Sequence, residues 1–119
     1  MLEVLPETTQ DLLAVRVSDE LTNEDFDIYR ELIRDRMKRF GTARLYYEMV
    51  NLSWVKPGAA LENALFDLVH GREYDRVAMV GDKLWQEWAA RLISPFKRKG
   101  VRYFNLVDRE QAMRWVREE

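Results

Sequence analysis

The chain has 119 residues, of which 47% are hydrophobic and 34% are charged, and its formal net charge at pH 7 is -2. This length suits one domain with a single core, and the balanced charge excludes the strongly basic surface that duplex nucleic acid requires. The sequence has no cysteine, which excludes disulfides, thiolate zinc sites and cysteine nucleophiles.

The N-terminal region predicts two strands, at residues 1–5 and 11–17. Apolar side chains alternate along the second strand, with Leu13 on one face and Arg16 on the other. The connection between the two strands is short, and a short connection joins antiparallel neighbours. The first strand is therefore predicted to lie at an edge of the sheet.

The clearest helix is predicted over residues 22–40. Thr22 and Asp25 have the spacing of a capping box, and Gly41 is suited to end the helix in a left-handed conformation. Apolar residues at steps of three and four form one stripe that we expect to be buried. The stripe consists of Phe26, Tyr29, Ile33, Met37 and Phe40.

Strands and helices alternate along the rest of the chain. Val77 to Val80 form an unbroken apolar run, typical of a strand that is buried on both faces. The alternation predicts parallel strands with right-handed crossovers and helices on both faces of the sheet. The predicted strands are 43–50, 77–80 and 101–107, and the predicted helices are 57–70, 82–93 and a last one capped by Asp108 and Gln111.

Several local motifs occur in a characteristic order: the strand ARLYYEM before the loop residue Trp54, the turn RVAMVGD before Trp85, VRYF at 101–104, and A-x-x-W at 112–115. In this order they resemble the SpoIIAA-like proteins, relatives of the bacterial anti-sigma-factor antagonists with the STAS fold. The resemblance implies an α/β fold with a single domain over residues 1–119. It would have a mostly parallel five-stranded sheet, an antiparallel N-terminal edge strand and four helices.

The resemblance also implies two kinds of function, neither of them enzymatic. STAS domains dock regulatory partner proteins, and anti-sigma-factor antagonists are switched by phosphorylation of a hydroxyl in a D-S-x-G-like segment after the third strand. Here that region reads NLSWVKPGA, which lacks the motif and offers Ser53 as its only hydroxyl. For the SpoIIAA-like relatives, the family suggests binding of hydrophobic ligands with membrane association.

Catalytic motifs are absent from the sequence. The one histidine, His70, precedes Gly71 near a predicted helix end, where a cation offsets the helix dipole. A triad of His70 with Ser53 or Ser94 would make a hydrolase, but no G-x-S-x-G elbow supports it. No phosphate-binding loop and no calcium-binding loop occurs. We therefore expect no enzyme, no metal and no cofactor, with a hydrolase as the alternative.

The helices predicted at 57–70 and 82–93 each carry apolar residues around half of their circumference. Both begin at the carboxyl edge of the sheet, where α/β folds bind ligands. Ordinary core packing is the alternative explanation for these side chains. Our hypothesis is that they line a site for a hydrophobic or lipid-like molecule between the second and third helices. The predicted ligand-binding residues are Trp54, Leu61, Leu65, Phe66, Trp85 and Trp88.

A basic connector beside apolar side chains predicts reversible contact with an anionic membrane surface, with a solvated loop as the alternative. No apolar run approaches the roughly 20 residues that a membrane span needs, and the N-terminus lacks the pattern of a secretory signal. We expect a cytoplasmic protein, peripheral at the membrane if it attaches at all. The predicted membrane-surface residues are Arg91, Phe96, Lys97, Arg98 and Lys99.

A regulatory protein-interaction module remains the alternative to ligand binding. It predicts the same exposed side chains, Phe66 and Trp54, without a cavity behind them. The partners expected from the sequence are thus a hydrophobic small molecule or lipid, an anionic membrane surface, or a regulatory protein, and not a nucleic acid.

Overall fold

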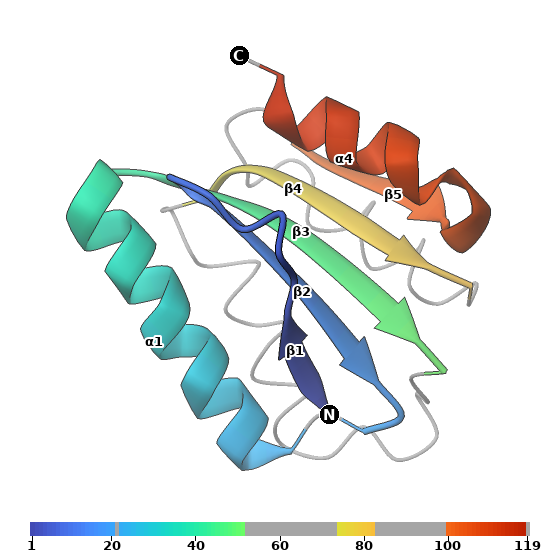
Figure 1. The fold of residues 1–119 in the computed structure, drawn as a ribbon, viewed down its shortest axis with the longest axis horizontal. Coiled ribbons are helices and arrows are strands. Elements are labelled where there is room, and N and C mark those ends of the chain that lie inside the picture. Colours follow the sequence, from blue (N-terminus) through green and yellow to red (C-terminus); the bar gives the residue numbers. More distant parts are fainter. Residues whose placement is uncertain (21, 52–73, 83–99, 119) are drawn as a thin grey trace.

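The computed structural model describes residues 1–20, 22–51, 74–82 and 100–118, which contain a five-stranded sheet and two α-helices (Figure 1). The strands lie in the order β1-β2-β3-β4-β5. β1 is antiparallel to β2, and all other neighbours are parallel. The strands are β1 (Leu2–Val4), β2 (Leu12–Ser18), β3 (Ala43–Val50), β4 (Tyr74–Gly81) and β5 (Val101–Asn105), and the α-helices are α1 (Asn23–Phe40) and α4 (Arg109–Arg117).

This arrangement confirms the α/β sheet and its antiparallel N-terminal edge strand. β4 begins three residues earlier than the predicted strand 77–80. β5 ends two residues before the predicted end at 107, because the chain enters a 3-10 helix, η2 (Leu106–Asp108). The helices predicted at 57–70 and 82–93 lie outside the described residues.

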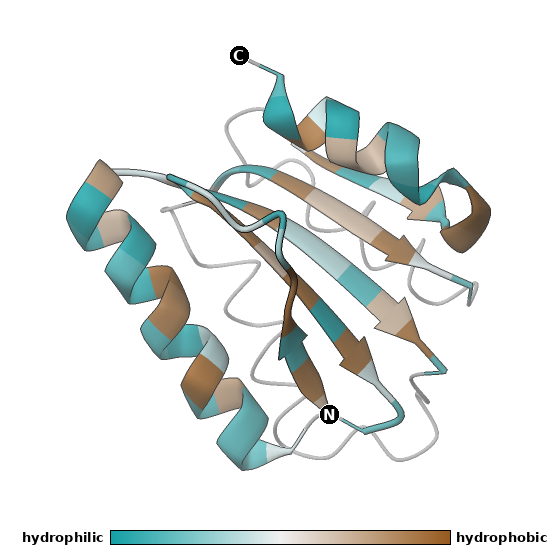
Figure 2. Ribbon diagram, in the orientation of Figure 1, coloured by the Kyte–Doolittle hydropathy of each residue, from teal (hydrophilic) through white to brown (hydrophobic). Residues whose placement is uncertain are grey.

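The two faces of the sheet are covered by different helices (Figure 1). α1 buries Phe26, Tyr29 and Ile33 on one face of β2 and β3. α4 buries Ala112 and Val116 on the other face, over β3, β4 and β5. Figure 2 shows the hydrophobic residues on the strands and the hydrophilic residues on the outer side of both helices. Side chains along β2 and β3 alternate between the two faces of the sheet, so each strand contributes residues to two separate apolar layers.

The start and the end of α1 follow the prediction. Thr22 accepts a hydrogen bond from the amide of Asp25, and Asp25 in turn accepts one from the amide of Thr22, which completes the capping box. Gly41 ends the helix with φ at 79°, a left-handed conformation that only glycine adopts without strain.

Two details of the helix predictions are wrong. Phe40 is 41% exposed rather than buried, since it is the last residue of α1, and the Arg39 guanidinium lies 5.5 Å from its ring centre. Asp108 precedes α4 but its side chain caps no amide. Its backbone completes the preceding 3-10 helix and so lacks the extended conformation that a capping residue needs.

Neither of the two described α-helices has the length and apolar character to cross a membrane.

Candidate binding cleft

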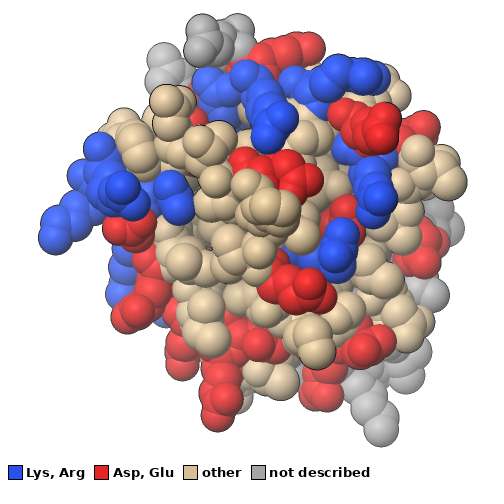
Figure 3. Space-filling view, viewed as in Figure 1, with Lys and Arg blue, Asp and Glu red and all other residues tan. Residues whose placement is uncertain are grey.

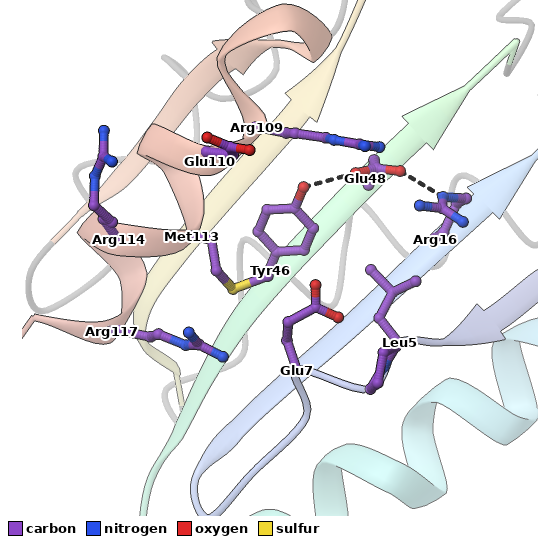
Figure 4. A pocket seen from close by; sticks show the side chains of 11 residues that line it. Leu5, Glu7, Arg16, Tyr46, Glu48, Arg109, Glu110, Met113, Arg114 and Arg117 are labelled. Carbon is purple, nitrogen blue, oxygen red and sulfur yellow. Dashed lines mark hydrogen bonds and ion pairs between the residues drawn. The ribbon is translucent and has the colours of Figure 1, made fainter.

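A cleft of about 510 Å³ opens on the α4 face of the sheet (Figure 4). Its floor is formed by side chains of β2 and β3, one wall by the connection from β1 to β2, and the other wall by α4. α4 packs over β3, β4 and β5, which leaves the β2 side of this face for the cleft. The volume falls in the range of small-molecule sites.

The first wall is held by the connection between β1 and β2. The Leu5 amide donates to the carbonyl of Ala14 at 2.8 Å. The Thr8 hydroxyl donates to the same carbonyl at 3.1 Å and accepts from the Ala14 amide at 3.0 Å. These bonds fix the segment that carries Leu5 and Glu7 against β2, because the Leu5 main chain and the Thr8 side chain are both tied to the main chain of Ala14.

The second wall is held by two arginines beneath the carboxyl end of α4. Arg44 of β3 donates to the carbonyls of Val116 at 3.2 Å and Glu118 at 2.8 Å, and Arg76 of β4 donates to the carbonyl of Trp115. The last carbonyls of a helix have no partner within the helix, and its dipole makes this end negative. The buried guanidinium of Arg76 and the partly buried one of Arg44 thus anchor α4 to the sheet.

The floor of the cleft holds a charged triad. Glu48 is only 2% exposed, and its Oε1 accepts from the Tyr46 hydroxyl at 2.7 Å. Its Oε2 accepts from Arg16 Nε at 2.5 Å (Figure 4). Arg16 is 31% exposed and lies 3.9 Å from a second carboxylate, that of Glu3. A buried carboxylate is tolerated when it is paired and hydrogen-bonded in this way.

The triad shifts the titration of its members. The hydrogen bond to Glu48 raises the pKa of the Arg16 guanidinium above its ordinary value. Burial, and then the hydrogen bond to Glu48, raise the pKa of the Tyr46 phenol far above 10. Tyr46 is therefore a neutral hydrogen-bond donor at physiological pH.

Replacing Tyr46 by phenylalanine is expected to change how stability depends on pH. In the wild-type protein the unfolded chain loses the phenol proton near pH 10 while the folded chain keeps it, so the contribution of Tyr46 is complete below pH 10 and lost above it. Between pH 10 and 12 the free energy of unfolding should fall by about 1 kcal/mol per pH unit more steeply in the wild type than in Tyr46→Phe. Urea unfolding at several pH values measures this, and equal slopes would contradict it.

The rim of the cleft is rich in arginine. Arg109, Arg114 and Arg117 on α4 line it, together with the acidic residues Glu7 and Glu110. Figure 3 shows basic side chains gathered over α4 with acidic ones among them. Apolar contact surface comes from Leu5, Pro6 and Met113. The described residues contain no group of three or more side chains placed to hold a metal ion.

The residues predicted from the sequence lie elsewhere in the chain. The ligand-binding set of Trp54, Leu61, Leu65, Phe66, Trp85 and Trp88 falls outside the described residues, and so does the membrane-surface set of Arg91, Phe96, Lys97, Arg98 and Lys99. The same holds for Ser53, His70 and Ser94. These assignments stay predictions.

Sequence reasoning missed the residues of the cleft. A signal existed, because Arg16 and Glu48 have opposite charges within strands that are otherwise mostly apolar. In the sheet they are direct neighbours in the pairing of β2 with β3. That register is not visible in the sequence, so the two charges were not recognised as a pair.

A family model and solved structures match the chain. The family model described as SpoIIAA-like matches residues 12–117. The crystal structure of an uncharacterized protein of the DUF3478 family from Shewanella loihica PV-4, which has a SpoIIAA-like fold, is 27% identical with a TM-score of 0.67. That alignment covers 97% of this chain and 93% of the other. No curated protein matches the sequence.

Proposed function

The chain belongs to the SpoIIAA-like family, and from this premise we propose that it is a non-enzymatic, STAS-like domain that acts by binding a regulatory partner protein. The match over residues 12–117 supports a single domain extending over residues 1–119. The four helices expected for this fold comprise α1, α4 and the two predicted at 57–70 and 82–93.

The observation that carries the proposal is the state of Glu48. Both oxygens of this carboxylate already accept hydrogen bonds, from Tyr46 and from Arg16. Each oxygen keeps a second lone pair, but the carboxylate is only 2% exposed and is held in place by both partners, whereas a general base must come within hydrogen-bond reach of the proton that it removes. The floor of the cleft is therefore suited to recognition rather than to reaction. A hydrolase, the enzymatic alternative, would depend on Ser53, His70 or Ser94, which lie outside the described residues.

The exposed charges of α4 indicate where a partner would bind. Arg109, Arg114 and Arg117 are exposed and make no ion pair with the described residues. Complementary charge at an interface increases the association rate and selects the partner. The partner is accordingly expected to present acidic side chains to α4.

Capture from an extract of the source cells tests this proposal with two matched variants. Arg114→Glu reverses a charge on α4, and Arg34→Glu makes the same change on α1, on the other side of the sheet. We expect a protein retained by the wild type and by Arg34→Glu, and lost with Arg114→Glu. The captured protein is then purified and titrated by calorimetry, where Arg114→Glu should weaken binding at least tenfold. Failure of the purified pair to bind, or equal loss in both variants, contradicts the proposal.

A second candidate function is the binding of a hydrophobic or lipid-like ligand at the carboxyl edge of the sheet. It is favoured by the parallel pairing of β3 with β4, because the carboxyl ends of parallel neighbours meet at one edge. Trp54 and Trp85 each follow the end of one of these strands by four residues. The proposed ligand-binding residues remain Trp54, Leu61, Leu65, Phe66, Trp85 and Trp88, and the proposed membrane-surface residues remain Arg91, Phe96, Lys97, Arg98 and Lys99.

Native mass spectrometry of the untreated protein separates the two candidates, since it detects a bound lipid directly. For ligand binding, we expect the tryptophan fluorescence response to added fatty acid to be lost in Trp54→Phe and Trp85→Phe. An unchanged response would place the ligand elsewhere.

For membrane contact, flotation with anionic liposomes at low salt should recover the protein, and its absence from the vesicle fraction would contradict that assignment.

A further inference from the structure

The arginines on the α4 face of the sheet fall into two groups, apart from Arg102 of β5, whose guanidinium lies over the rings of Phe104 and Trp115. Arg16, Arg44 and Arg76 lie on strands, and each is bonded to a carboxylate or to main-chain carbonyls. Within the described ranges, the arginines of α4 have no such partner. These three, Arg109, Arg114 and Arg117, all line the cleft.

Figure 4 shows how the arginines of α4 are directed. Arg109 extends across the floor toward Glu48, and Arg117 points toward Glu7 from the other end of the cleft. Arg114 points away from both. Between the two inward-pointing arginines lie the ring of Tyr46 and the side chain of Met113. The cleft therefore combines two guanidinium groups with an apolar surface between them.

The charge balance favours an anion. Glu48 is neutralised by Arg16, so it exerts little attraction on a cation at the floor. The remaining lining charges are Glu7 and Glu110 against the three arginines of α4. Guanidinium groups bind carboxylate and phosphate oxygens through paired hydrogen bonds, and such bonds are stronger than neutral ones.

We propose that this cleft binds a small organic anion, a carboxylate or a phosphate ester with a compact apolar group. Arg117 holds the anionic group at one end of the cleft, the apolar group rests on Tyr46 and Met113, and Arg109 adds positive charge from the other end. The site is distinct from the predicted hydrophobic site at the carboxyl edge of the sheet. It also does not depend on the proposed partner protein, because a purified chain suffices to test it.

The first experiment is an NMR titration of the purified protein with four probes, observing backbone amides and methionine methyl groups. Phenylacetate and phenyl phosphate carry both features, whereas inorganic phosphate and benzyl alcohol each lack one. We expect at least one of the first two to shift the Met113 methyl signal and to bind at least tenfold more tightly than either single-feature probe. Whichever of phenylacetate and phenyl phosphate binds more tightly shows whether the cleft prefers a carboxylate or a phosphate group. Shifts confined to other parts of the chain, or no saturable shift with either, overturn the proposal.

The second experiment compares variants of the lining residues with the better probe. Replacing both Arg109→Gln and Arg117→Gln should weaken binding about tenfold or more, while Arg34→Gln, a charge loss on α1 outside the cleft, should change it less than twofold. Glu7→Gln removes a negative charge from the cleft and should strengthen binding severalfold. Equal loss from Arg34→Gln, or weaker binding in Glu7→Gln, overturns the proposal. Because Glu7→Gln is expected to bind the probe more tightly, and a variant that fails to fold could only bind it less tightly, this result does not depend on any loss of folding.

Discussion

Replacing Arg16 by leucine is expected to lower the free energy of unfolding by about 3 kcal/mol. The change leaves the carboxylate of Glu48, which is 2% exposed, without a charged partner. Breaking a buried ion pair by removing one member typically costs about 3–5 kcal/mol, and the lower end applies because Arg16 itself is 31% exposed. Urea unfolding monitored by tryptophan fluorescence measures the change.

The double variant Arg16→Leu with Glu48→Leu is the matched control. It removes both charges, and a buried pair replaced by apolar side chains is often close to neutral. We expect it to be more stable than Arg16→Leu alone, although the Tyr46 hydroxyl loses its acceptor. A double variant as unstable as the single one would show that the loss comes from packing and not from the unpaired carboxylate.

Replacing Leu45 by alanine is expected to cost about 3 kcal/mol of unfolding free energy. Leu45 is fully buried in β3, and its direct neighbours in the sheet are Leu13 of β2 and Val77 of β4, which are also fully buried. These strands hold the backbone on both sides, so the cavity left by the missing side chain cannot collapse. Ile28→Ala on α1 is the control, since Ile28 is 52% exposed and should lose less than about 1 kcal/mol. Similar losses in both variants would contradict this account.

Much of the sheet could be predicted from the sequence, because the strands carry the strongest periodic signal. The alternation around Leu13 and Arg16 located β2 to within one residue, and the unbroken apolar run at 77–80 identified β4, although this strand begins three residues earlier. The α1 helix was predicted through its capping box and Gly41. The ends of elements were predicted less well, as at Asp108, because local geometry there depends on the 3-10 helix that precedes it.

The cleft could not be predicted in the same way. Its floor depends on the alignment of Arg16 with Glu48 across two strands separated by a whole helix. One wall depends on where α4 comes to lie, which Arg44 and Arg76 help to fix by bonding to its main-chain carbonyls. Such contacts join residues that are distant in the sequence and leave no periodic pattern. The sequence instead drew attention to apolar side chains, which form conspicuous patterns along helices.

The alignment of Arg16 with Glu48 has a consequence for folding. Side chains along a strand alternate between faces, so a slip of one residue between β2 and β3 would turn one of these charges into the apolar layer beneath α1. A slip of two residues would keep the faces but separate the pair. The salt bridge forms only in the observed register, so it disfavours misaligned pairing of β2 with β3 in addition to any stability that it contributes. Variants that lack both charges are accordingly expected to fold with more heterogeneous strand pairing, even where their equilibrium stability is close to that of the wild type.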